Sequence, residues 1–150
     1  MTTAPFDPWR AAEHHDDLIL AAHPLARLMG GGFYAQLGST SIIVVDPDLD
    51  GAERRVVLTH ELVHHERGGS VARTGAPERL QALVDREERA VDREVARRLV
   101  PDAELRTLVC EHLGAGDGLD VREVADHFEV PVAIASLALA ALAGDRPIPR

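Results

Sequence analysis

The feature that most constrains this chain is the run LTHELVHHER at residues 58–67, which holds three histidines. On an α-helix, residues four apart lie one turn apart on the same face, so His60 and His64 can converge on one cation. His65 lies about 140° around the helix axis from His60 and cannot join them. Glu61 stands beside the pair, where it is poorly placed as a ligand. The spacing therefore predicts a helix with a metal-binding face.

These residues spell the pattern HExxH, in which two zinc ligands flank a general base. In that reading His60 and His64 bind the metal, and Glu61 takes a proton from a water activated by the metal. The alternative is a charged surface helix that carries the pattern by accident. A third ligand elsewhere in the chain decides between them, because catalytic zinc takes three protein ligands and keeps one position for water.

A second helix, expected over residues 78–100, carries the candidates for the third ligand. Its apolar stripe consists of Leu80, Val84, Val91, Val95 and Leu99. Glu88 falls inside this stripe and Asp92 on its edge, whereas Glu87 and Glu94 lie further round. A nearby cation would offset the desolvation of a carboxylate on an apolar face, and so would an arginine from another element. We favour Glu88 as the third ligand and Asp92 as the acceptor of a ligand histidine's spare N–H.

Local signals place the other elements. We expect a helix or helix pair over 9–29 interrupted near Pro24, and hairpin strands at 33–37 and 41–46. Asp50 should cap the histidine helix, which Gly68-Gly69 should end. Short helices should follow Pro101 over 102–143. The predicted class is α+β, with a small antiparallel or mixed sheet packed on the HExxH helix and on the second ligand-bearing helix. We expect one domain over 1–150, with its core at about 1–101 and a helical region at about 102–150.

Composition excludes several classes of protein. The formal net charge of −9 argues against direct binding to nucleic acid or to an anionic membrane. The single cysteine, Cys110, allows no intrachain disulfide, and its apolar neighbours predict that it is buried. The N-terminus does not read as a signal peptide, and the apolar run 130–143 is shorter than the about 20 residues that span a bilayer. We therefore expect a cytoplasmic protein.

Three segments together resemble the ImmA/IrrE family of gluzincin-like metallopeptidases: SIIVVDPDL (41–49), DGAERRVVLTHELVHHERG (50–68) and EERAVDREVARRLVP (87–101). The positions of Glu88 and Asp92 before Pro101 match the family's glutamate ligand and its Asn/Asp. Val91 and Glu94 depart from the alanine and phenylalanine usual there. The resemblance implies a zincin-like fold and a Zn²⁺ cofactor. It also implies a regulatory endopeptidase, often of a phage or mobile element, whose protein substrate is a DNA-binding repressor.

Other readings stay open. The second function class is a non-catalytic, metal-binding interaction protein that keeps the same fold. Tyr34, His65 and His112 are candidates for stabilising an oxyanion. Residues 13–17, EHHDD, are a candidate for a second metal site, but adjacent histidines on a helix diverge, which favours a solvated face. Residues 119–142 resemble a helix-turn-helix, yet 130–144 contain no Arg, Lys, Asn or Gln to read bases, so a packing role is favoured.

Overall fold

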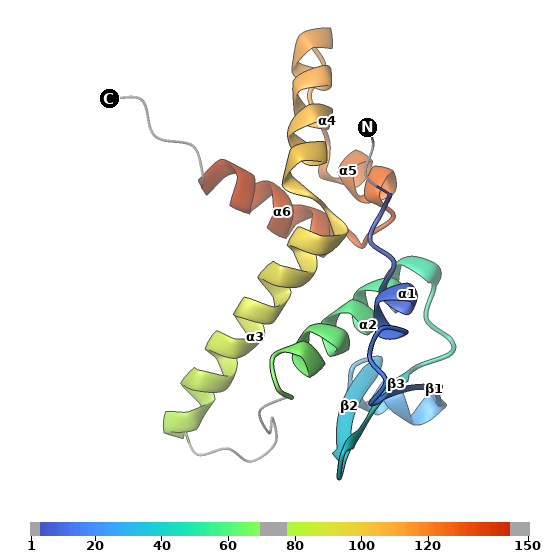
Figure 1. Cartoon of the computed structure of the whole chain (residues 1–150). Coiled ribbons are helices and arrows are strands. Elements are labelled where there is room, and N and C mark those ends of the chain that lie inside the picture. The colour runs from blue at the N-terminus through green and yellow to red at the C-terminus, as the bar shows by residue number, and fades with distance from the viewer. Residues whose placement is uncertain (1–3, 70–77, 145–150) are drawn as a thin grey trace. The chain divides into compact units, whose positions relative to one another are not determined.

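The computed structural model describes residues 4–69 and 78–144 (Figure 1). The chain has the predicted α+β class: a small mixed sheet precedes a series of helices. It forms two compact units, residues 1–95 and 96–150, and the boundary between them falls inside α3. The elements in chain order are α1 (Pro8–Ala12), β1 (Leu18–Ala22), η1 (Pro24–Met29), β2 (Gly32–Leu37), β3 (Thr40–Val45), α2 (Gly51–Glu66), α3 (Glu78–Leu99), α4 (Asp102–Ala115), α5 (Val121–Phe128) and α6 (Val132–Gly144).

The sheet in the described part of the chain has three strands in the order β1-β3-β2. β2 and β3 form the predicted antiparallel hairpin, from Gly32 opposite Val45 to Leu37 opposite Thr40. Gly38 begins the turn at a φ of +64°, a conformation that glycine adopts without steric cost. β1 runs parallel to β3 on the other side, so the sheet is mixed and β3 is its central strand.

The expectation of a helix or helix pair over residues 9–29 was wrong for most of that stretch. Only α1 is an α-helix, capped by the Asp7 carboxylate, which accepts from the backbone N–H groups of Trp9 and Arg10. Residues 18–22 form β1, because their backbone pairs with the distant strand β3. Pro24 then opens the 3₁₀ helix η1, which ends at Gly30 with a φ of +84°.

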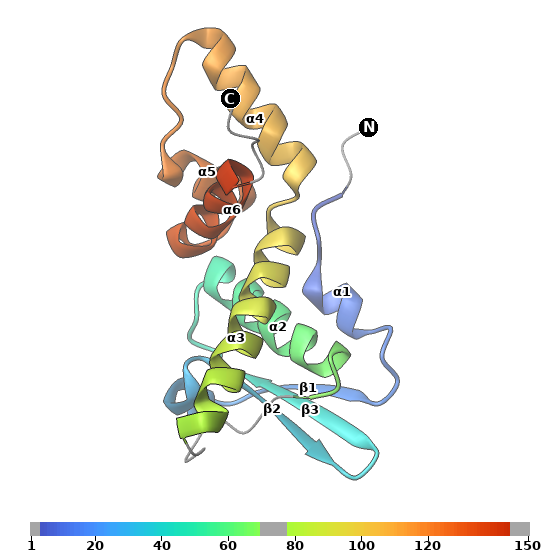
Figure 2. The ribbon, with the colours of Figure 1, turned by 90° about the vertical axis from the view of Figure 1, so that its left-hand side faces the viewer.

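Helix α2 packs on β2, β3 and α1, and it begins and ends as the sequence predicts. The Asp50 carboxylate accepts from the N–H of Glu53 at 2.8 Å, which caps the helix. After its last turn, the N–H of Gly69 donates to the carbonyl of His64 at 2.8 Å. The core between α1, α2 and the sheet is built from Ala12, Ile43, Val45, Leu58 and Leu62. Figure 2 shows α2 above the strands with α3 beside it.

Helix α3 follows the predicted boundaries to within a residue. Its stripe is buried at Val84, Val91 and Val95, whereas Leu80 in the first turn is 44% exposed. The Arg67 guanidinium, just after α2, donates to both carboxylate oxygens of Glu87 at 2.6 and 2.9 Å. This paired contact joins α3 to the end of α2 at the residue before Glu88.

The second unit contains α4, α5 and α6, with buried side chains such as Leu105, Val124 and Ala135. Asp120 and Glu123 form a reciprocal capping box at the start of α5. The expectation that Cys110 is buried was wrong: it lies on the exposed side of α4, two residues past the buried Leu108. Among the described residues, no single helix is long and apolar enough to cross a membrane, although α5 and α6 meet that test as a pair bent by 110°.

Candidate metal centre

The two histidines of α2 that lie one turn apart meet at their outer nitrogens. His60 Nε2 and His64 Nε2 are 3.1 Å apart, and His64 is fully buried. His65, the next residue, leaves the helix in another direction and contacts the Tyr34 hydroxyl through Nδ1 at 3.2 Å. His60 and His64 therefore share one face of α2 and His65 lies on another, as the helical period predicts.

Glu88 on α3 reaches both imidazoles. One carboxylate oxygen lies 3.3 Å from His60 Nε2 and the other lies 3.1 Å from His64 Nε2. Two ligands of a tetrahedral zinc at the usual bond lengths are about 3.3 Å apart, so the three donors already stand at the spacing that this ion requires. The described residues thus bring His60, His64 and Glu88 together as a possible metal site that spans two helices.

Asp92 lies one turn beyond Glu88 and contacts the opposite nitrogen of His60. Its carboxylate is 3.3 Å from His60 Nδ1. Acceptance of the Nδ1 proton by this carboxylate would leave the Nε2 lone pair directed at the cluster, as carboxylates do behind ligand histidines in metal sites. The Glu88 carboxylate therefore faces the Nε2 atoms, and the Asp92 carboxylate lies behind the His60 ring.

The electrostatic field at this cluster is negative. Burial alone lowers the pKa of His60, but the Asp92 hydrogen bond and the charges of Glu61 and Glu88 outweigh it and raise that pKa above its usual value. A position that favours a proton on an imidazole also favours another cation, because both respond to the same carboxylates. The donor set and its charge therefore fit a divalent ion such as zinc.

Glu61 is buried, with 3% of its surface exposed, and lines the same cavity as His60, Glu88 and Asp92. This cavity has a volume of about 310 Å³. Gly32, at the start of β2, forms part of its wall, and a Cβ there would overlap a methyl group of Val57 and stand 3.6 Å from the Glu61 side chain. The absent side chain at Gly32 lets α2 lie close to the sheet and brings Glu61 against β2.

Two of the three candidates for an oxyanion stabiliser belong to the unit that holds the cavity, but they do not line it. Tyr34 and His65 are not among the residues that line the cavity, and the Tyr34 hydroxyl contacts Ser41 Oγ at 2.9 Å. His112 belongs to the second unit, where its Nδ1 contacts the carbonyl of Leu108 in the preceding turn. Within the first unit, the structure therefore brings neither Tyr34 nor His65 to the cavity beside residues 60 and 88.

A second group of possible metal ligands was not predicted from the sequence; in it, His65 meets residues of the loop between α1 and β1. His15, Asp17 and His65 each offer a donor atom, and these atoms all lie within 4.8 Å of one another. The sequence predicts a helix over residues 13–17, on which neighbouring histidines would diverge. They form turns instead, and His65 comes from 50 positions further along the chain, so no local pattern signals the group.

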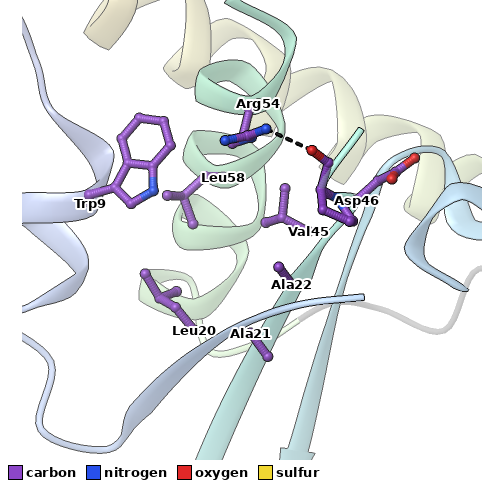
Figure 3. Close-up of a pocket in the computed structure, with 9 residues that line it drawn as sticks. Trp9, Leu20, Ala21, Ala22, Val45, Asp46, Arg54 and Leu58 are labelled. Carbon is purple, nitrogen blue, oxygen red and sulfur yellow. Dashed lines mark hydrogen bonds between the residues drawn. The ribbon is translucent and has the colours of Figure 1, made fainter. Parts of the chain in front are cut away.

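Another cavity, of about 300 Å³, lies between α1, β1 and α2 (Figure 3). Trp9, Leu20 and Leu58 give it apolar walls. Its charged groups are already engaged: Arg54 donates to the carbonyls of Pro47 and Leu49 at 2.8 and 3.1 Å, and Asp46 accepts from Arg27 at 3.0 Å. Its lining provides no pair of groups for acid–base chemistry, so the cavity beside Glu61 is the candidate site.

No family model, curated protein or solved structure matches this chain. The resemblance to the ImmA/IrrE family therefore rests on the three motif segments in the sequence.

Proposed function

We propose that this chain is a zinc-dependent endopeptidase resembling the ImmA/IrrE metallopeptidases. The observation that carries the proposal is the position of Glu61: a buried carboxylate faces the same cavity as His60 and Glu88. A site that only held a metal would have no need of a further carboxylate beside it. An endopeptidase of this kind needs one as its general base.

In the proposed mechanism His60, His64 and Glu88 hold the ion, and Asp92 keeps His60 in the required tautomer. Zinc, when bound, polarises a peptide carbonyl and makes a coordinated water more acidic. Glu61 takes the proton of the attacking water and later delivers it to the leaving amine. Its buried position limits competition from bulk water for that proton.

The surroundings of the cavity suit an extended peptide. β2 is an edge strand of the described sheet and begins at the cavity with Gly32, so a substrate backbone can pair alongside it. Met29, Val56 and Val57 provide apolar walls for a side chain of that peptide. We infer a protein substrate with an accessible extended segment, and from the family resemblance a DNA-binding repressor encoded nearby.

The test is cleavage of such a repressor by purified, zinc-loaded protein, followed by mass spectrometry of the fragments. Glu61→Gln should lower the cleavage rate by at least about 10²-fold while one zinc ion stays bound at residues 60, 64 and 88, because only the general base is lost. Glu88→Ala should lose both that zinc ion and activity. Asp85→Ala removes an exposed carboxylate from the same helix and should retain both.

Two results would contradict the proposal. Cleavage by Glu61→Gln at the wild-type rate would remove Glu61 from its role. A wild-type protein that binds zinc and the repressor but leaves its peptide bonds intact would instead identify the non-catalytic interaction protein.

A further inference from the structure

The group formed by His15, Asp17 and His65 is separate from the residues of the proposed zinc centre. Asp17 Oδ1 lies 3.5 Å from His65 Nε2, and the rings of His15 and His65 meet edge to face with centroids 4.9 Å apart. The three donor atoms all lie within 4.8 Å of one another. Glu66 adds a carboxylate oxygen 3.6 Å from His15 Nε2. Two imidazoles and a carboxylate thus converge at the junction of the α1–β1 loop with the end of α2.

The backbone holds both parts of this group in place. The carbonyl of Asp17 accepts from the N–H of Ser41 on β3 at 2.7 Å, and the carbonyl of His15 accepts from the N–H of Leu18 at 3.1 Å. His65 lies in the last turn of α2, which Gly68 and Gly69 close. The donors therefore stand on ordered backbone, and a small rotation of side chains would bring all three to bonding distance of one ion.

Tyr34 orients the His65 ring. Its hydroxyl lies 3.2 Å from His65 Nδ1 and 2.9 Å from Ser41 Oγ. If Nδ1 donates to the Tyr34 oxygen and the Tyr34 hydroxyl donates to Ser41, His65 Nε2 is left with its lone pair toward Asp17. A hydrogen bond to the far nitrogen of the ring is the arrangement that supports a metal-bound histidine.

We propose that His15, Asp17 and His65 form a second binding site for a divalent transition-metal ion, which clips the α1–β1 loop to the end of α2. Two imidazoles with one carboxylate suit zinc and its neighbours in the first transition series better than magnesium or calcium. This proposal does not depend on peptidase activity. Its site shares no residue with the centre formed by residues 60, 64 and 88.

The experiment counts zinc ions on the intact chain by native mass spectrometry after equilibration with zinc alone. The wild type should bind two ions. His15→Ala and Asp17→Asn should each bind one, or bind the second ion at least about tenfold more weakly. His14→Ala is the matched control, since His14 is a neighbouring exposed histidine whose Nδ1 contacts the carbonyl of Arg10, and it should bind two.

Glu88→Ala separates the two sites. It should keep one ion and lose it when His15→Ala is added, and zinc should still raise its melting temperature. Circular dichroism checks that each variant is folded. If His15→Ala does not fold, Asp17→Asn, which removes only a charge, replaces it in the experiment. A wild type that binds one ion or none, or a second ion unaffected by either substitution, would overturn the proposal.

Discussion

At the scale of single residues, the histidines of α2 are sorted by the angle at which they leave the helix. His60 and His64 face Glu88, whereas His65 faces Tyr34 and Asp17. That division follows from the 3.6-residue period and was predictable from the sequence. The distance between the Glu88 carboxylate and these imidazoles was not predictable, because the local sequence does not determine how α3 packs against α2. Only the placement of a carboxylate within an apolar stripe pointed to it.

The role assigned to Asp92 can be tested through metal affinity. Asp92→Asn removes the charge that contacts His60 Nδ1 but leaves the zinc-facing donors in place. We expect zinc at residues 60, 64 and 88 to bind about 10–100-fold more weakly, because the histidine loses the acceptor that fixes its tautomer. Competition with a chelating dye measures this, with Asp85→Asn on the same helix as control. Equal affinity in the Asp92 and Asp85 variants would assign Asp92 no part in binding.

At the scale of elements, the strength of local signals explains which predictions held. The β2–β3 hairpin has β-branched and aromatic residues and a glycine turn, and α2 has a cap and a double-glycine stop. Both elements were therefore predictable from the sequence. β1 was not, because LILAA is a short apolar run that fits a helix or a strand equally well. Its strand state arises from parallel pairing with β3, more than 20 residues away.

The close approach of α2 to β2 should depend on Gly32. A methyl group at this position would overlap Val57, so Gly32→Ala should destabilise the protein by about 1–3 kcal/mol. Urea unfolding measures the loss. Gly51→Ala is the control, since a Cβ there meets no atom within 4 Å. Adding Val57→Ala to Gly32→Ala should recover part of the lost unfolding free energy. If the double variant loses the sum of the two single losses, the side chains at positions 32 and 57 do not collide.

The ion pair between Arg27 of η1 and Asp46 after β3 should contribute less to stability as the pH falls. Hydrogen bonds from Arg27 and from the N–H of Asp48 lower the pKa of Asp46 below its ordinary 3.8. A carboxyl with a lowered folded-state pKa contributes stability that is present above its unfolded pKa and lost as the pH falls through the folded value. The unfolding free energy of wild type should therefore exceed that of Asp46→Asn near neutral pH. This difference should shrink below about pH 3.8, and a constant difference across that range would contradict the assignment.

At the scale of the whole molecule, a metal would join two consecutive helices, α2 and α3. The donors at residues 60 and 64 lie on α2 and the donor at residue 88 lies on α3, where the Arg67–Glu87 pair provides another contact. Zinc at 100 times its Kd should stabilise this arrangement by about 2.7 kcal/mol. Hydrogen exchange over residues 78–95 should then slow by up to about 100-fold on zinc addition. Glu88→Ala should abolish this protection and Asp85→Ala should retain it; protection that persists in Glu88→Ala would place the ion elsewhere.

The division of the chain at residue 95 has a bearing on how such a protein can diversify. Every side chain invoked for catalysis or for holding an ion precedes that point, whereas α4, α5 and α6 follow it. Substitutions on the surface of α4, α5 and α6 can therefore change what the second unit contacts without replacing a proposed metal ligand or the proposed general base.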